Sequence, residues 1–133
     1  MASLPLVAFR EQLALAAAVV RRARPTAVNL TWAVDRLLAL AMKLDSDPHE
    51  VAARLAREAT AILEEDRAMC SSMGEHALAL LREPIRVLTH CNTGALATGG
   101  IGTALAAVYL AHERGMDVHV YACETRPLLQ GSR

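Results

Sequence analysis

The chain has 133 residues, of which 53% are hydrophobic and 3% aromatic, and this length and composition predict one globular domain with an aliphatic core. Fourteen basic residues balance fourteen acidic ones, which excludes the broad positive field expected of a nucleic-acid-binding protein. No apolar run reaches the length needed to cross a bilayer and no secretory leader is recognisable, so the sequence favours a cytoplasmic protein.

Two helices are predicted in the first third of the chain. The first covers residues 6–23, where apolar side chains recur at helical spacing without an internal glycine or proline. Arg24 and Pro25 break it, because the residue before a proline avoids the helical region. Pro25 suits the first turn of a new helix, and this second helix is predicted over residues 26–44.

A third and longer helix is predicted to begin at Asp47. Asp47 can cap this helix, Pro48 fits its first position, and Glu50 can complete a capping box. Residues 71–74 include two serines and a glycine, which weaken the middle of the helix, so we expect either a kink or a split into two helices. The helix is expected to end at residues 82–84, where the chain reaches a proline.

The last third of the chain is typical of a strand-helix-strand unit. A short strand beginning at Arg86 is expected to be buried through Val87 and Leu88. Alternating apolar and polar residues predict a second strand over 118–123, and an apolar run between the strands predicts a helix over about 102–114. A strand, crossover helix and strand of this length form a right-handed parallel unit.

These elements predict an α/β fold class. A helical N-terminal region, residues 1–83, precedes the first β-α-β unit of a Rossmann-like parallel sheet, residues 84–133. Two strands leave both sheet edges unpaired, whereas parallel sheets are normally larger and covered on both faces. The predicted sheet is therefore incomplete: helices wrap its edges, another chain supplies strands, or the sequence is a piece of a longer protein.

Four glycines follow the first predicted strand, at positions 94, 99, 100 and 102. Glycine permits close approach of a ligand, and the helix N-terminus beyond them offers unpaired N–H groups, so an anion such as a phosphate is the first candidate. The spacing matches neither a P-loop nor the dinucleotide-binding fingerprint. Spacing alone leaves two interpretations equally favoured: phosphate binding, or glycines that permit tight packing of a helix on a strand.

The cysteines and histidines have no metal-ligand spacing. Cys70, Cys91 and Cys123 are odd in number and far apart, which argues against disulfides and zinc and predicts reduced thiols, with Cys70 and Cys123 in the core. Cys91 is either a thiol that faces a ligand or a small buried hydrophobe. His90 and Cys91 are not expected to form a dyad, because neighbours in an extended strand point to opposite faces.

Three segments carry a resemblance to a known family. They are RPTAVNLTWAVDRLL at 24–38, THCNTGALATGGIGTALAAVYLAHERG at 89–115 and VHVYACETRPLLQG at 118–131. Together and in this order they closely resemble the methylthioribose-1-phosphate isomerases of methionine salvage. Relatives that share the fold are ribose-1,5-bisphosphate isomerases and the regulatory subunits of the exchange factor for translation initiation factor 2. The resemblance implies an enzyme that interconverts an aldose 1-phosphate and its ketose without a required metal or cofactor.

The resemblance also implies which residues form the site. Arg24 matches the family's substrate-binding arginine, Cys91 its active-site cysteine and Gln130 its substrate-binding glutamine. A guanidinium at Arg24 suits a phosphate dianion. We hypothesise that Arg24 and the loop 92–102 hold the phosphate while Cys91 stabilises charge developing on the sugar. The first residues of this loop, also expected to bind substrate, are Asn92, Thr93 and Gly94.

The sequence departs from the family's pattern in two places. An arginine-glycine-alanine motif is expected upstream of Arg24, where the string is absent, and a proton-donating aspartate is expected downstream of Gln130, beyond Arg133. We therefore expect an isomerase fragment with impaired or no activity alone. The alternatives are a non-catalytic sugar-phosphate or nucleotide-binding subunit like the translation-factor relatives, a ribose-1,5-bisphosphate isomerase, and a truncated chain that folds poorly or survives only as a dimer.

Overall fold

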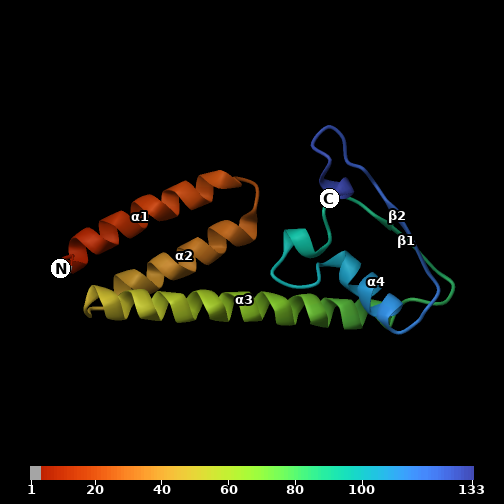
Figure 1. Cartoon of the computed structure of the whole chain (residues 1–133), viewed down its shortest axis with the longest axis horizontal. Helices are drawn as coiled ribbons and strands as arrows, with labels where there is room; N and C mark the ends of the chain where they lie inside the picture. The colour runs from red at the N-terminus through yellow and green to blue at the C-terminus, as the bar shows by residue number, and fades with distance from the viewer. Residues whose placement is uncertain (1–3) are drawn as a thin grey trace. The chain divides into compact units, whose positions relative to one another are not determined.

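The computed structural model describes residues 4–133, which divide into two compact units (Figure 1). The division falls between Ile62 and Leu63, inside a helix that contributes its first half to one unit and its second half to the other. No helix in the described residues is long and apolar enough to span a bilayer.

The first unit contains helices α1 (Leu6–Ala23) and α2 (Val28–Lys43) and the first half of α3 (Pro48–Leu78). The prediction for α1 is confirmed at both ends. The expectation for Pro25 was wrong: α2 begins only at Val28, and Pro25 lies in a turn closed by the N–H of Ala27 on the carbonyl of Arg24 at 3.0 Å. The fixed φ of Pro25 therefore favours this turn and not the first turn of α2.

Helix α3 begins at its predicted cap and is not split. The N–H of His49 donates to Asp47 Oδ1 at 2.8 Å, which satisfies one of the first-turn donors. The helix then runs unbroken from Pro48 to Leu78, so the alternative of two separate helices was wrong (Figure 1). It ends four residues before the expected segment 82–84, where the chain turns toward the sheet.

The second unit is built on the predicted strand-helix-strand arrangement. Strand β1 (Ile85–Thr89), helix α4 (Ala104–Glu113) and strand β2 (Val118–Ala122) follow one another, and the two strands pair in parallel from Ile85 opposite Val118 to Thr89 opposite Ala122. Helix α4 ends in a Schellman motif, in which the N–H of Met116 donates to the carbonyl of Ala111 at 3.0 Å. The predicted fold class, an incomplete parallel sheet after a helical region, is confirmed.

The core of the second unit lies on one face of this two-stranded sheet. Leu78, Ile85, Ala107 and Ala111 form a buried cluster between the end of α3, β1 and α4. The expectation that Leu88 is buried was wrong, since 75% of its surface is exposed. Side chains alternate along a strand, so once Ile85 faces the core its neighbour three positions later faces away from it.

Candidate functional site

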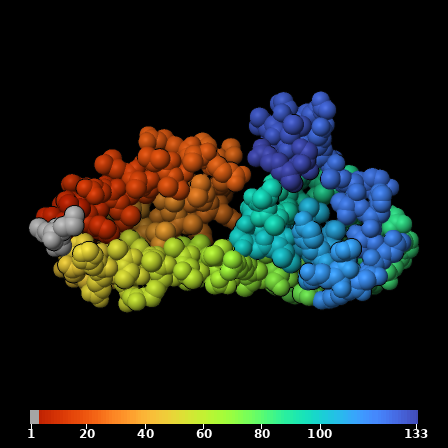
Figure 2. Space-filling view, in the orientation of Figure 1, coloured from red at the N-terminus to blue at the C-terminus, as the bar shows by residue number. Residues whose placement is uncertain are grey.

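The two strands bring distant parts of the sequence together at one edge of the sheet. Because β1 and β2 are parallel, their carboxyl ends lie side by side, where ligand sites of open α/β sheets form. The N–H of Cys123 donates to the carbonyl of Thr89 at 3.0 Å, which extends the pairing by one residue beyond β2. In Figure 2 the blue C-terminal segment stands out from the second unit and meets the cyan loop that follows β1.

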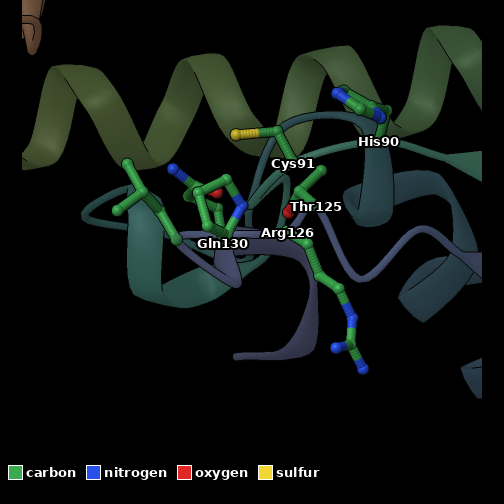
Figure 3. Close-up of a pocket in the computed structure, with 7 residues that line it drawn as sticks. His90, Cys91, Thr125, Arg126 and Gln130 are labelled. Carbon is green, nitrogen blue, oxygen red and sulfur yellow. The ribbon is translucent and has the colours of Figure 1, made fainter.

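A cavity of about 270 Å³ opens between the segments that leave these two strands (Figure 3). Cys91, directly after β1, lines it together with Gln130, which follows β2 by eight residues. Two of the residues predicted to form the site, 39 positions apart, therefore share one cavity. The remaining lining residues are His90, Thr125, Arg126, Pro127 and Leu128.

Left-handed backbone conformations mark both walls of the cavity. Cys91 has φ 65° and Thr125 has φ 58°, values that side-chain-bearing residues rarely adopt. Such conformations cost on the order of 1–3 kcal/mol each and persist only where the surroundings impose them, often at functional sites. Around Thr125 the surroundings are visible: its hydroxyl accepts from the N–H of Gly131 at 2.6 Å and its carbonyl from the N–H of Leu129 at 2.9 Å.

Arg126 brings a positive charge to the rim of the cavity. Its Nε donates to one carboxylate oxygen of Glu124 at 2.6 Å and its second nitrogen to the other at 3.2 Å. The guanidinium extends away from Cys91 and Gln130 in Figure 3, and the Arg126 side chain is 78% exposed. The forked pair with Glu124 therefore orients Arg126 along the rim rather than into the cavity.

The expectations for Cys70 and His90 hold, whereas the expectation that Cys123 lies in the core was wrong. In Figure 3 the imidazole of His90 and the sulfur of Cys91 point in different directions, as expected for two residues that do not form a dyad. Cys70 is 1% exposed, which confirms its place in the core, whereas Cys123 is only half-buried. Between residues 4 and 133 no group of three or more histidine, cysteine or acidic side chains could hold a metal ion.

Asn92, Thr93 and Gly94 do not belong to the lining of this cavity. Instead they shape the turn after Cys91. Asn92 Oδ1 accepts from the N–H of Gly94 at 3.3 Å, and the hydroxyl of Thr93 lies 2.7 Å from that of Thr89. Gly94 itself is buried, with the hydroxyl of Tyr109 3.8 Å from where a Cβ would stand.

The amides of the glycine loop are bonded to the protein itself. The N–H of Gly99 donates to Asp66 Oδ2 at 2.7 Å, and those of Gly100 and Gly102 donate to Thr98 Oγ1 at 3.3 and 3.1 Å. A carboxylate thus stands at Gly99 where an anionic ligand would have to bind. Of the two interpretations that the sequence left open, this geometry favours glycines that permit close packing.

Arg24 lies in the first unit, exposed in the turn between α1 and α2. The expected meeting of Arg24 with Cys91 at one substrate stays a prediction.

Three comparisons with known proteins give consistent relationships. The model of the initiation factor 2 subunit family matches residues 3–133. A methylthioribose-1-phosphate isomerase from Roseiflexus sp. is 56% identical over 123 residues, which are 92% of this chain and 35% of that protein. The enzyme of that name from Gloeobacter violaceus is 57% identical over 120 residues, 88% of this chain and 33% of its own length.

Two solved structures are also similar. The translation initiation factor eIF-2B subunit delta from A. fulgidus is 46% identical with a TM-score of 0.75, and the match covers 93% of this chain and 36% of that one. The 5-methylthioribose 1-phosphate isomerase from Pyrococcus horikoshii OT3 is 34% identical with a TM-score of 0.85, and the match covers 100% of this chain and 37% of that one. The chain thus spans about a third of the length of the relatives it matches.

Proposed function

Because the chain belongs to the initiation factor 2 subunit family, we propose that it is part of a methylthioribose-1-phosphate isomerase of the methionine salvage pathway. This enzyme converts 5-methylthioribose 1-phosphate to 5-methylthioribulose 1-phosphate. The curated relatives of that name, at 56 and 57% identity, support this activity over the others that occur in the family.

One observation carries the proposal. Cys91 and Gln130, which the resemblance assigns to the active site, lie in segments that follow different strands and line the same cavity. Its volume of about 270 Å³ is near the lower end of the range for small-ligand pockets, which suits a single sugar phosphate. A thiol on one wall and an amide on the other supply a donor and an acceptor to the sugar hydroxyls.

The remaining site residues take complementary roles in this proposal. Arg24 binds the phosphate through two parallel hydrogen bonds, since the geometry of a guanidinium matches that of a phosphate dianion. Asn92, Thr93 and Gly94 hold the turn that presents Cys91 to the substrate, and Cys91 stabilises charge that develops on the sugar during isomerisation. No metal or cofactor is needed for an aldose-ketose conversion of this kind.

The cellular setting is also a proposal. We infer a cytoplasmic enzyme that binds no nucleic acid, because its three cysteines are all unpaired and its basic and acidic residues balance. We further infer that β1, α4 and β2 are the first unit of a larger Rossmann-like sheet and that the protein acts as a homodimer. The exposed Leu88 and the unpaired strand edges support additional covering polypeptide.

Calorimetric titration of the 133-residue chain with 5-methylthioribose 1-phosphate tests the proposed function. We expect binding by the unchanged chain, and a loss of roughly tenfold in affinity for Gln130→Ala, because one hydrogen bond to the sugar is removed. Gln12→Ala makes the same chemical change at an exposed position of α1 and should leave the affinity unchanged. Absence of binding by the unchanged chain would contradict the proposal.

Turnover is a separate measurement. NMR of the ketose product, with a full-length relative as reference, should show conversion by the 133-residue chain that is far slower or absent, since the chain spans about a third of such a relative. Turnover at the rate of the full-length enzyme would show that residues 1–133 contain every essential group.

A second candidate is a non-catalytic sugar-phosphate or nucleotide-binding subunit. The observation in its favour is the 46% identity with a translation initiation factor eIF-2B delta subunit. Competition between 5-methylthioribose 1-phosphate and AMP in the same titration separates the candidates. An isomerase binds the thiosugar phosphate preferentially, whereas preference for the nucleotide would favour the binding subunit.

A further inference from the structure

Helix α3 holds the loop that follows Cys91 at one residue, Gly99. The N–H of Gly99 donates to Asp66 Oδ2 at 2.7 Å, and the carbonyl of Gly99 accepts from Arg67 Nε at 3.1 Å. Asp66 and Arg67 are consecutive residues of α3, so one turn of a helix fixes both hydrogen-bonding groups of a loop residue. Each of these bonds has a charged partner and is therefore stronger than a neutral one.

The loop lies directly against α3 at this point. A Cβ on Gly100 would stand 3.0 Å from the Cβ of Cys70 and 3.2 Å from the Cα of Arg67, which leaves no room for a side chain. Cys70 is 1% exposed beneath it. The two hydrogen bonds to Gly99 therefore act on a segment that is already closely packed, and the segment cannot shift without losing both.

Hydrogen bonds within the loop link the segment around Gly99 with Thr93, which lies two residues after Cys91. The hydroxyl of Thr98 accepts from the N–H of Gly102 at 3.1 Å, and the carbonyl of Thr93 accepts from the N–H of Thr103 at 2.9 Å. The loop therefore closes on itself just after Cys91. Cys91 has a left-handed φ of 65°, a strained conformation that persists only where the surrounding structure imposes it.

We propose that Asp66 and Arg67 are positioning residues for the cavity. By holding Gly99 they keep the loop closed, and the closed loop keeps Cys91 in the conformation that lines the cavity. Neither residue touches the cavity itself. The identity of the ligand rests on the proposed function, whereas the effect on the loop does not.

Amide hydrogen exchange measured by NMR tests the effect on the loop. In Asp66→Ala the amides of Gly99, Gly100 and Gly102 should exchange about tenfold faster or more, because the Gly99 amide loses a charged acceptor. Asp66→Asn keeps an acceptor oxygen and should stay within about threefold of the unchanged chain. Glu75→Ala is the matched control, since it removes another α3 carboxylate, which pairs with Arg114, and should not alter the loop.

Ligand affinity tests the effect on the cavity. The affinity for 5-methylthioribose 1-phosphate should fall about tenfold in Asp66→Ala and recover in Asp66→Asn, while the thermal midpoints of Asp66→Ala and Glu75→Ala are similar. Loop exchange like that of the unchanged chain in Asp66→Ala would overturn the inference, as would altered exchange with unchanged affinity.

Two further outcomes remain decisive. If Asp66→Ala does not fold, Arg67→Met carries the same test, because the Arg67 side chain is 52% exposed and its loss spares the core. The other outcome is that the unchanged chain does not bind the sugar phosphate while amide exchange in the loop is faster in Asp66→Ala. This result would reject the proposed function but support the inference that α3 fixes the loop.

Discussion

Cys91 differs from the other two cysteines in its exposure, and this difference is open to direct measurement. Cys91 is exposed, Cys123 half-buried and Cys70 1% exposed, so iodoacetamide should alkylate them in that order. Addition of 5-methylthioribose 1-phosphate at ten times its Kd should slow alkylation of Cys91 about tenfold, because only about a tenth of the sites stay open. Site-resolved mass spectrometry gives all three rates in one sample.

Cys123 serves as the internal control in this experiment, since it does not line the cavity. Equal protection of Cys91 and Cys123 would indicate a general change in the protein and would contradict binding beside Cys91.

Two glycines with positive φ are predicted to differ in how much an added side chain costs. Gly102 has φ 101°, and a Cβ there would stand 2.6 Å from the carbonyl oxygen of Thr93, a backbone atom that cannot move aside. Gly115 has φ 74° but open space around it. Gly102→Ala should lower the free energy of unfolding by about 3 kcal/mol, from backbone strain plus overpacking, and Gly115→Ala by about 1 kcal/mol.

Urea unfolding of both variants measures this difference. Equal losses in the free energy of unfolding would mean that backbone strain alone sets the cost of the side chain. Gly102 would then not lie close to the carbonyl of Thr93.

The residues of the candidate site could be predicted only in part from the sequence. Cys91 and Gln130, which line the cavity, were predicted through the resemblance, because a motif ties each to a chemical role. Asp66 was not found: on a long charged helix it has the pattern of a solvated face, and its contact with Gly99 spans 33 residues of sequence. Contacts of this kind depend on the tertiary path of a loop, which local patterns do not contain.

Helix α3 is continuous through Gly74, where its sequence suggests a break. A Cβ on Gly74 would stand 2.8 Å from Leu110 Cδ1 and 3.0 Å from the Cβ of Ala106, so the glycine allows α4 to pack closely on α3. Local propensity favours a break at glycine, but packing between helices outweighs it. Periodicity in the sequence predicted which segments are helices and which are strands. It did not predict that Gly74 packs against α4.

Replacement of Gly74 tests this explanation. Alanine raises helix propensity by about 1 kcal/mol but meets Ala106 and Leu110 at an overpacking cost of about 1–3 kcal/mol, so Gly74→Ala should be destabilising on balance. Ser71→Ala, at an exposed position of the same helix, should be neutral or slightly stabilising. Thermal unfolding monitored by circular dichroism compares the two, and stabilisation by both variants would show that α4 does not pack closely on α3.

The sheet of the second unit has one face in the core and the other open to solvent. Ile85 is 2% exposed, whereas Leu88 is 75% and its register partner Tyr121 is 56% exposed. The sequence could not make this distinction, because a short run of apolar residues is expected of a strand buried on both faces. Parallel sheets are usually covered on both faces, so the open face is consistent with a chain that spans about a third of the length of its relatives.

Truncation of one residue from each face measures this asymmetry. Ile85→Ala removes buried atoms from the cluster with Leu78 and Ala111, and should lower the free energy of unfolding of the 133-residue chain by about 2–5 kcal/mol. Leu88→Ala removes atoms that already contact water and should change it by no more than about 0.5 kcal/mol. Urea unfolding at two protein concentrations compares the variants and detects association. A cost above about 2 kcal/mol for Leu88→Ala that grows with concentration would mean that a second copy covers the open face, whereas the same cost without concentration dependence would contradict the exposed position of Leu88.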